Sequence, residues 1–155
     1  NAIPTAEGTI QQIMSNTDTT IDGSAFLIIG AGRVALTLGQ RLKALGGEVT
    51  IAARKQDQIA RSIALGIYAT QIESVKGTFE AVVNTVPAPI LTKEFFRQNR
   101  TTLYVELASD SGLLDPLPTK ISHLALPGLP GKYAPKKAGT YLASSIPPLI
   151  AKLLK

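Results

Sequence analysis

A glycine-rich turn directly after a short apolar run constrains the fold more than any other feature of this sequence. Residues 25–29 are continuously apolar, and Gly30-Ala31-Gly32-Arg33-Val34-Ala35 follows them with the spacing G-x-G-x-x-A. A continuous apolar run of this length is typical of a strand that is buried on both faces of a parallel sheet. After the motif, Leu38, Leu42 and Leu45 recur with the period of a helix. The motif therefore joins a buried strand to a helix, which is the context in which such glycines hold a dinucleotide.

Strands and helices continue to alternate along the rest of the chain. The apolar patterns predict strands near residues 49–52, 67–69, 81–85, 103–107 and 123–126, and helices near residues 4–16, 56–65, 93–98 and 135–154, with a short helix after Glu73. This alternation predicts an α/β fold of the Rossmann type: a doubly wound parallel sheet of about six strands with helices on both faces.

The length of the chain, 155 residues, suffices for one hydrophobic core and not for two. We therefore expect a single dinucleotide-binding domain over residues 1–155, in which residues 1–24 form a leading helix and a connection. Because the chain starts at Asn1 without an initiator Met, we expect it to be a piece of a longer chain.

Composition excludes several classes of site. The chain has no Cys and one His, His123, which excludes a disulfide scaffold, a thiol nucleophile and a Cys-based zinc site, and we expect no metal. No apolar run reaches the roughly 20 residues that a membrane helix needs, and no signal-peptide pattern opens the chain, so we expect a cytoplasmic protein without membrane contact. The net charge of +5 is spread along the sequence, which favours a local anion site over a nucleic-acid surface.

The glycine motif predicts how the diphosphate of a dinucleotide binds. Gly30 makes the tight turn, Gly32 lets the backbone approach the diphosphate, and Ala35 permits close packing of the helix against the strand. The N-terminus of the helix attracts the phosphate charge, so we expect Arg33 and Val34 in its first turn to contact the nucleotide as well. The alternative is a glycine-rich turn that only connects two elements.

The end of the second predicted strand indicates which nucleotide binds. NAD-specific domains place an Asp or Glu there, about twenty residues after the glycines, to bind the ribose hydroxyls. Here the stretch reads Ala52-Ala53-Arg54-Lys55. A guanidinium can hold a 2′-phosphate through two hydrogen bonds and an ammonium adds charge, so Arg54 and Lys55 favour NADP as the cofactor. The alternative is that both side chains form the solvated start of a helix.

Polar or rigid segments follow the later strands, and in an open α/β sheet they face the same crevice as the nucleotide. Asn84-Thr85-Val86-Pro87 is expected to line the ribose and nicotinamide path, and Ser109 lies in a polar cluster after the next strand. In the Pro- and Gly-rich loop 127–135, Lys132 is a candidate for binding a carboxylate or moving a proton, and Tyr133 for stacking on a ring. Ordinary turn chemistry explains the first two segments equally well, and a solvated Lys beside a packing Tyr explains the third.

Taken together, these motifs resemble the C-terminal nucleotide-binding domain of the dipicolinate synthase A family. The resemblance runs through nearly the whole chain, and its carriers are the opening Ile3-Pro4-Thr5-Ala6-Glu7-Gly8, the glycine motif with Arg33, and the segments 49–55, 84–87, 107–109 and 127–136. The opening and the last segment are the most specific of these, since many dehydrogenases share the glycine motif. Asp110-Ser111-Gly112 departs from the basic or Gly-rich stretch that the family leads us to expect.

The resemblance implies an NADP-dependent oxidoreductase that oxidises dihydrodipicolinate to dipicolinate in the mother cell during sporulation. It also implies a flavoprotein-like partner, the B component of dipicolinate synthase, and a small dicarboxylate substrate. For that substrate Lys132 is the first candidate residue and the helix N-terminus at Thr5 the second, with Ser109 and Tyr133 nearby, while Glu7 is a candidate acceptor for the ring proton.

Two other functions remain open at this point. A non-catalytic nucleotide-binding or assembly module fits the lack of a strong general base. An NADP-dependent 2-hydroxyacid or shikimate-type dehydrogenase fits the layout, although each normally shows a His or a Lys–Asp arrangement that the sequence does not. The sequence leaves a homo-oligomer open.

Overall fold

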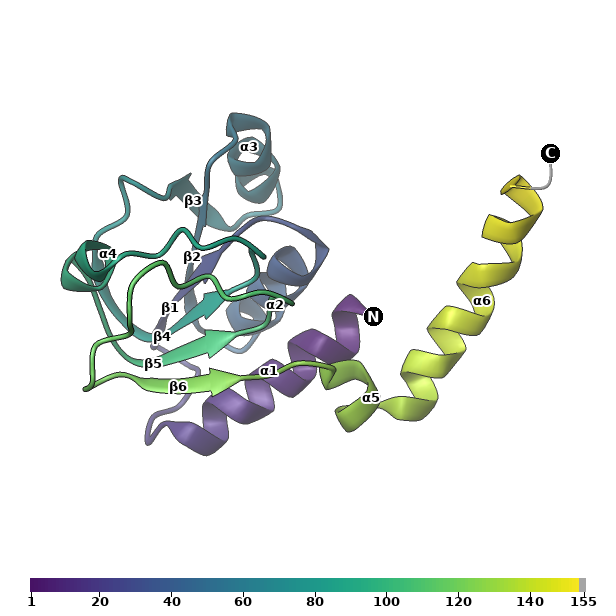
Figure 1. Ribbon diagram of the computed structural model, residues 1–155, viewed down its shortest axis with the longest axis horizontal. Helices are drawn as coiled ribbons and strands as arrows, with labels where there is room; N and C mark the ends of the chain where they lie inside the picture. Colours follow the sequence, from purple (N-terminus) through teal and green to yellow (C-terminus); the bar gives the residue numbers. More distant parts are fainter. Residues whose placement is uncertain (154–155) are drawn as a thin grey trace.

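The computed structural model describes residues 1–153 of the chain (Figure 1). Its helices and strands alternate in the order α1 (Ala2–Asn16), β1 (Ala25–Ile29), α2 (Arg33–Ala44), β2 (Glu48–Ala53), α3 (Gln56–Ala64), β3 (Tyr68–Gln71), β4 (Gly77–Asn84), α4 (Lys93–Gln98), β5 (Asn99–Glu106), β6 (Ser122–Ala125), α5 (Leu129–Tyr133) and α6 (Pro135–Leu153).

The strands form one six-stranded sheet in the order β3-β2-β1-β4-β5-β6, and every pair is parallel. The predicted Rossmann-type α/β fold is thereby confirmed. Strand β1 lies at the centre, where it pairs with β2 on one side and with β4 on the other. The direction of strand succession reverses between β1 and β4, and in open α/β sheets this is the point at which ligands bind.

Side chains of β1 alternate between two apolar layers. Phe26 and Ile28 join the core under α1, α2 and α3, whereas Leu27 and Ile29 join a second cluster with Phe96 of α4. All four side chains are fully or almost fully buried, which explains why this strand has no polar position in the sequence. The sheet is therefore covered on both faces, by three helices on one and by α4 with long loops on the other.

Two segments differ from the sequence prediction. The helix expected after Glu73 is absent, and the chain turns directly into β4. The segment between the end of β3 at Gln71 and the start of β4 at Gly77 is too short for a stable helix. Conversely, the loop expected over residues 127–135 contains the short helix α5. Gly128 precedes it with a φ of 70°, and Pro130 stands in its first turn, where proline is compatible with a helix.

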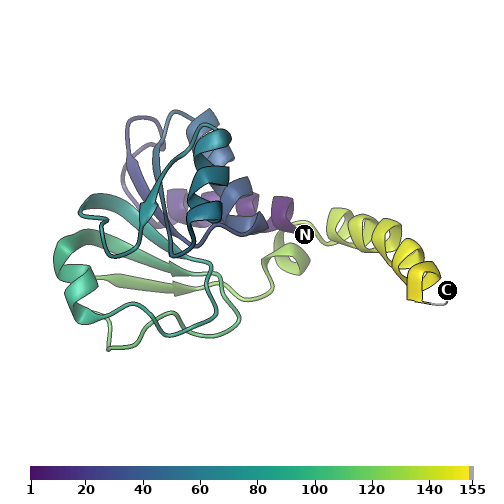
Figure 2. The same cartoon turned by 90° about the horizontal axis from the view of Figure 1, so that it is seen from above.

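Helix α6 leaves the body of the domain after α5 and projects away from the sheet in both views (Figures 1 and 2). Leu142 and Ile146 on this helix are about half exposed. Across residues 1–153, the helices are too short or too polar to span a bilayer.

Candidate functional site

A cavity of about 270 Å³ opens at the carboxyl edge of the sheet, above the junction of β1 with β4. Its walls come from the segments that follow three strands: the glycine turn after β1, the basic residues after β2 and the turn after β4. The lining residues include Gly30, Ala31, Gly32, Ala53, Arg54, Lys55, Gln58, Thr85, Val86 and Pro87. The structure thus brings together residues that the sequence predicts for the site from three separate segments.

Gly30 allows the turns after β1 and β4 to approach each other closely. Its φ is +101°, a conformation that other residues rarely adopt, and a Cβ atom at this position would lie 2.9 Å from Cγ2 of Val86 and against Oγ1 of Thr85. The Gly30 amide donates to the carbonyl of Ala52 at 2.8 Å. A side chain at position 30 would therefore push the two turns apart.

Gly32 leaves the start of α2 open. A Cβ atom here would meet nothing within 4 Å, and Gly32 caps the helix without a side-chain hydrogen bond. The first helical bond is donated by Leu36 to the Gly32 carbonyl, so the amides of Arg33, Val34 and Ala35 have no partner within the helix. Free amides beside an open space fit the oxygens of a diphosphate.

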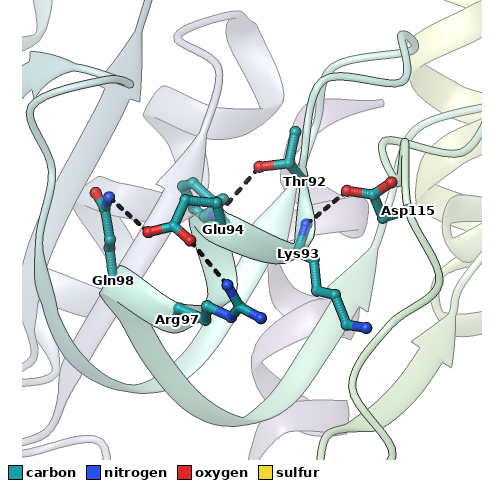
Figure 3. Close-up of polar contacts among 7 residues, drawn as sticks. Thr92, Lys93, Glu94, Arg97, Gln98 and Asp115 are labelled. Carbon is teal, nitrogen blue, oxygen red and sulfur yellow. Dashed lines mark hydrogen bonds and ion pairs between the residues drawn. The ribbon is translucent and has the colours of Figure 1, made fainter.

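Helix α4 provides a contrast, because side chains satisfy its first amides (Figure 3). The Thr92 hydroxyl accepts from the Phe95 amide at 3.1 Å, and the Asp115 carboxylate accepts from the Lys93 amide at 2.8 Å. No side chain among residues 1–153 does the same for α2. The open helix start is therefore a property of the glycine motif, since neither Gly nor Ala at its N-terminal positions can provide a cap.

Arg33 and Val34 contribute to the site through their backbone. The Arg33 side chain is exposed and the Val34 side chain is half-buried, and neither is among the cavity-lining residues. Their predicted contact with a nucleotide is thus limited to the amides of the first helical turn.

Arg54 and Lys55 form the basic wall of the cavity. Both side chains are exposed, and within residues 1–153 neither is paired with a carboxylate. Lys55 is also the N-cap residue of α3 and makes no side-chain cap bond, so the positive end of that helix dipole adds to the two charges. This wall can attract a phosphate group.

A second cavity, of about 340 Å³, adjoins the first and shares Arg54, Ile72 and Ile90 with it. Its remaining walls include Glu73 after β3 and Glu94 in α4. No motif in the sequence marks these acidic residues, and only the fold brings them beside Arg54. Glu94 is already engaged by Gln98 at 3.0 Å and by Arg97 at 3.4 Å (Figure 3).

The turn after β4 is held from below by Asn84. Its side chain is fully buried, donates to the Val86 carbonyl at 2.9 Å and to Glu106 at 2.7 Å, and accepts from the Val86 amide at 3.1 Å. Thr85 donates from its hydroxyl to the Ile29 carbonyl at 2.8 Å. The sequence predicts a nucleotide contact for Asn84, but the structure places its side chain beneath the turn, while Thr85, Val86 and Pro87 line the cavity.

The residues expected to hold substrate lie elsewhere. Tyr133 packs its ring over Gly8 of α1, and Gln12 of α1 donates to its hydroxyl. Lys132 is exposed, with Nζ 5.4 Å from the centre of the Tyr133 ring. Neither residue lines the cavity, so α5 and α1 form a separate packing unit beside it.

Thr5, Glu7 and Ser109 are also outside the cavity. The Thr5 hydroxyl donates to the Asn1 carbonyl at 2.9 Å within α1, and the Ser109 hydroxyl donates to Asp110 at 3.1 Å in an exposed position. Glu7, the candidate proton acceptor, forms an exposed ion pair with Arg41 of α2 at 3.4 Å. Glu7 is thus paired with α2 and is not among the residues that line the cavity.

Comparisons with known proteins identify the family of the chain and agree with its fold. Residues 5–105 match the family model described as D-isomer specific 2-hydroxyacid dehydrogenase, NAD binding domain. The A-type subunit of dipicolinate synthase from Bacillus subtilis (strain 168) is 35% identical over 160 residues, which cover 99% of this chain and 54% of that protein.

Two solved structures are similar over the same extent. The crystal structure of dipicolinate synthase A from Bacillus subtilis matches with a TM-score of 0.87 at 34% identity, and that of dipicolinate synthase A from Bacillus halodurans with a TM-score of 0.82 at 33% identity. Each match covers 99% of this chain and 54% of the other. The resemblance indicated by the sequence motifs is thereby confirmed, and the chain spans about half the length of these relatives.

Proposed function

Because the chain belongs to the family of NAD-binding domains of D-isomer specific 2-hydroxyacid dehydrogenases, we propose that its cavity binds a nicotinamide dinucleotide for an oxidoreductase. The observation that carries this proposal is the open start of α2, where Gly32 adds no side chain and three amides lack helical partners. We further propose that residues 1–155 act as the nucleotide-binding domain of a longer protein.

NADP is the nucleotide that the basic wall favours. Arg54 and Lys55 line the cavity at the end of β2, where an acidic residue would bind the ribose hydroxyls of NAD and repel a 2′-phosphate. The N-terminus of α3 at Lys55 adds favourable potential for the same phosphate. Arg54, whose guanidinium can bind two phosphate oxygens, and Lys55, whose ammonium is a point charge, would hold the 2′-phosphate of NADP.

The reaction that we propose is the oxidation of dihydrodipicolinate to dipicolinate, by similarity to dipicolinate synthase A. A bound NADP would supply the hydride acceptor for this oxidation, and the proton released as the dihydropyridine ring becomes aromatic would go to solvent or to a base. Aromatisation makes the step favourable, so the protein chiefly has to orient a dicarboxylate. Exposed Lys132 on α5 is our candidate for one carboxylate, and the first turn of α1 at Thr5 for the other.

The same similarity supports a proposal for a partner and a setting. Since the relatives are named as one of the subunits of dipicolinate synthase, we propose that the protein acts with a second subunit of the flavoprotein type, the B component. We place this assembly in the cytoplasm of the mother cell of a spore former.

Gly32→Ala tests nucleotide binding with little risk to the fold. The new methyl group meets no protein atom within 4 Å and the backbone there needs no glycine conformation, so the free energy of unfolding should change by no more than the roughly 1 kcal/mol of a helix-cap substitution. The methyl group would occupy the space beside the free amides of α2, and we expect the dissociation constants for NADPH and NADH to rise about tenfold or more, which corresponds to about 1.4 kcal/mol.

Gly139→Ala in α6 is the matched control, because its Cβ atom also meets nothing within 4 Å and lies outside the cavity. Titration calorimetry of both variants gives the comparison. If wild-type protein bound neither nucleotide, or if Gly32→Ala bound both as well as Gly139→Ala does, the proposed site would be wrong.

The oxidation itself requires a turnover assay. Formation of NADPH from NADP and dihydrodipicolinate should be followed for this chain, for the full-length protein, and for each of them with the flavoprotein-type partner. We expect turnover only where the full-length protein is present. If none of the four mixtures turned over dihydrodipicolinate while nucleotide binding was intact, the proposed oxidation would be wrong. A non-catalytic nucleotide-binding module would then be favoured.

The family match also favours a second candidate, oxidation of a D-2-hydroxyacid. The same four mixtures, supplied with D-2-hydroxyacids in place of dihydrodipicolinate, test it. The single histidine of the chain, His123, is exposed on β6 and does not line the cavity, so a histidine base for this reaction would have to come from outside residues 1–155.

A further inference from the structure

Glu106, at the carboxyl end of β5, is a buried carboxylate that the proposed reaction does not use. Only 7% of its surface is exposed, and within residues 1–153 no Lys or Arg forms an ion pair with it. A charge in such a place is tolerated only when hydrogen-bond donors replace the lost water. Four donors surround it: the Asn84 amide nitrogen at 2.7 Å, the Tyr104 hydroxyl at 2.6 Å, and the backbone amides of Ala108 at 3.3 Å and Gly112 at 2.8 Å.

The two oxygens of this carboxylate serve different segments. Oε1 accepts from Asn84 and Ala108, and Oε2 accepts from Tyr104 and Gly112. Burial, together with the hydrogen bond and the charge of Glu106, raises the pKa of Tyr104 above its ordinary value of 10.0, so the phenol stays a donor. Oε2 therefore has two donors of its own, the Tyr104 hydroxyl on β5 and the Gly112 amide in the loop after it.

The Oε1 side fixes the orientation of the Asn84 amide. A carboxylate only accepts hydrogen bonds, so the amide nitrogen must face Glu106, and the amide oxygen is left for the Val86 backbone N–H. The same nitrogen also donates to the Val86 carbonyl. The Asn84 side chain, oriented by Glu106, thus binds both the backbone N–H and the carbonyl of Val86, and Val86 lines the nucleotide cavity.

The side chains of Asn84 and Tyr104 are tightly packed against Gly112. A Cβ atom at Gly112 would lie 2.7 Å from Cγ of Asn84 and 3.1 Å from the Tyr104 hydroxyl. The Gly112 carbonyl accepts from the amides of Ile90 and Leu91 at 2.9 and 2.8 Å, so the loop after β5 is tied to the segment that follows the turn. The carboxylate is the common acceptor at the centre of these segments.

We propose that Glu106 is a positioning residue for the nucleotide: acting through Asn84, it holds the turn Thr85–Pro87 in its binding shape without touching the ligand. This inference rests on the proposed function, because it assigns the turn to nucleotide binding. It predicts that nucleotide affinity depends on the Oε1 side of the carboxylate more than on the Oε2 side.

A double-mutant cycle tests the route through Asn84. Glu106→Gln and Asn84→Ala should each raise the dissociation constant for NADPH about tenfold or more, and the double variant should bind no more weakly than the weaker of the two single variants. Tyr104→Phe is the matched control, since it removes a donor from the same buried carboxylate on the Oε2 side. It should lower the thermal midpoint to an extent comparable with Asn84→Ala, yet change the dissociation constant less than about threefold.

Amide hydrogen exchange gives a readout that needs no nucleotide. The Val86 amide should exchange faster in Glu106→Gln and in Asn84→Ala than in wild type, and should keep its wild-type rate in Tyr104→Phe. If Glu106→Gln does not fold, Glu106→Asp takes its place, because it keeps the carboxylate and shortens its reach to Asn84. The Val86 amide should exchange faster in that variant too, and an unchanged rate would overturn the inference.

The outcomes separate this inference from the proposed function. Wild-type protein that binds no nicotinamide dinucleotide would overturn the proposed function, and the inference with it. A second outcome would overturn only the inference. In it the wild-type protein binds the nucleotide, but the affinity or the Val86 exchange rate of every variant, Tyr104→Phe included, changes in proportion to its thermal stability. Glu106 would then be a structural residue. Additive effects of Glu106→Gln and Asn84→Ala on affinity would also overturn it.

Discussion

Arg54 lines both cavities at the carboxyl edge of the sheet. On one side it faces the glycine turn, and on the other it adjoins the acidic residues Glu73 and Glu94. Its charge is thus exposed to ligands at the nucleotide cavity, and within residues 1–153 no carboxylate binds it within ion-pair distance. Arg54 and Lys55 together carry the preference for NADP that we propose.

Arg54→Glu should therefore weaken NADPH selectively. The change replaces a charge-assisted hydrogen bond, worth about 1.5–3 kcal/mol, with a repulsive contact to the 2′-phosphate. We expect the dissociation constant for NADPH to rise by at least about tenfold and that for NADH by no more than about threefold, as measured by parallel titrations.

Arg100→Glu makes the same charge change at the opposite edge of the sheet, where Arg100 is exposed near the start of β5. It should leave the ratio of the two affinities unchanged. An equal loss of NADPH and NADH binding in Arg54→Glu would mean that the guanidinium does not contact the 2′-phosphate.

Helices α1 and α5 bring the opening motif and the last motif of the sequence into contact. Tyr133 of α5 covers Gly8 of α1, and a Cβ atom at Gly8 would lie 2.9 Å from Cδ2 and 3.2 Å from Cγ of the tyrosine ring. Gly8 is itself buried in α1. The opening motif and the last motif therefore form the two sides of one contact between helices α1 and α5.

Gly8→Ala should destabilise the domain although alanine is the better helix former. Overpacking against Tyr133 costs about 1–3 kcal/mol, whereas the gain in helix propensity is about 1 kcal/mol at most. In a Tyr133→Ala background the ring is gone, and the same substitution should become neutral or stabilising. Urea unfolding of the four proteins measures both effects, and an equal cost of Gly8→Ala in both backgrounds would show that Tyr133 is not the cause.

At the scale of the whole molecule, the features that depend on local chemistry could be predicted from the sequence. The order of strands and helices follows from apolar periodicity, and the position of Gly30 and Gly32 in the turn that joins β1 to α2 follows from the glycine motif. Arg54 and Lys55 could be placed at the cavity because the carboxyl ends of parallel strands share one edge.

Features that depend on distant partners could not be predicted. The orientation of the Asn84 side chain is set by Glu106, 22 positions later in the sequence. The Tyr133 hydroxyl accepts a hydrogen bond from Gln12, 121 positions earlier. A polar residue at a strand end looks the same in sequence whether it faces a ligand or a buried carboxylate. The opening motif makes Glu7 a candidate through its neighbours, but the direction of its side chain depends on Arg41 of another helix.

The sheet order has one more consequence. Strands β3-β2-β1 and β4-β5-β6 form two halves that meet in the sheet only along the β1–β4 seam, and the cavity takes Gly30 and Arg54 from one half and Thr85 and Val86 from the other. A nucleotide bound there joins the halves across this seam. Since a ligand held only by the folded state, at about a hundred times its dissociation constant, adds about 2.7 kcal/mol to stability, the seam should open far less often in the loaded protein.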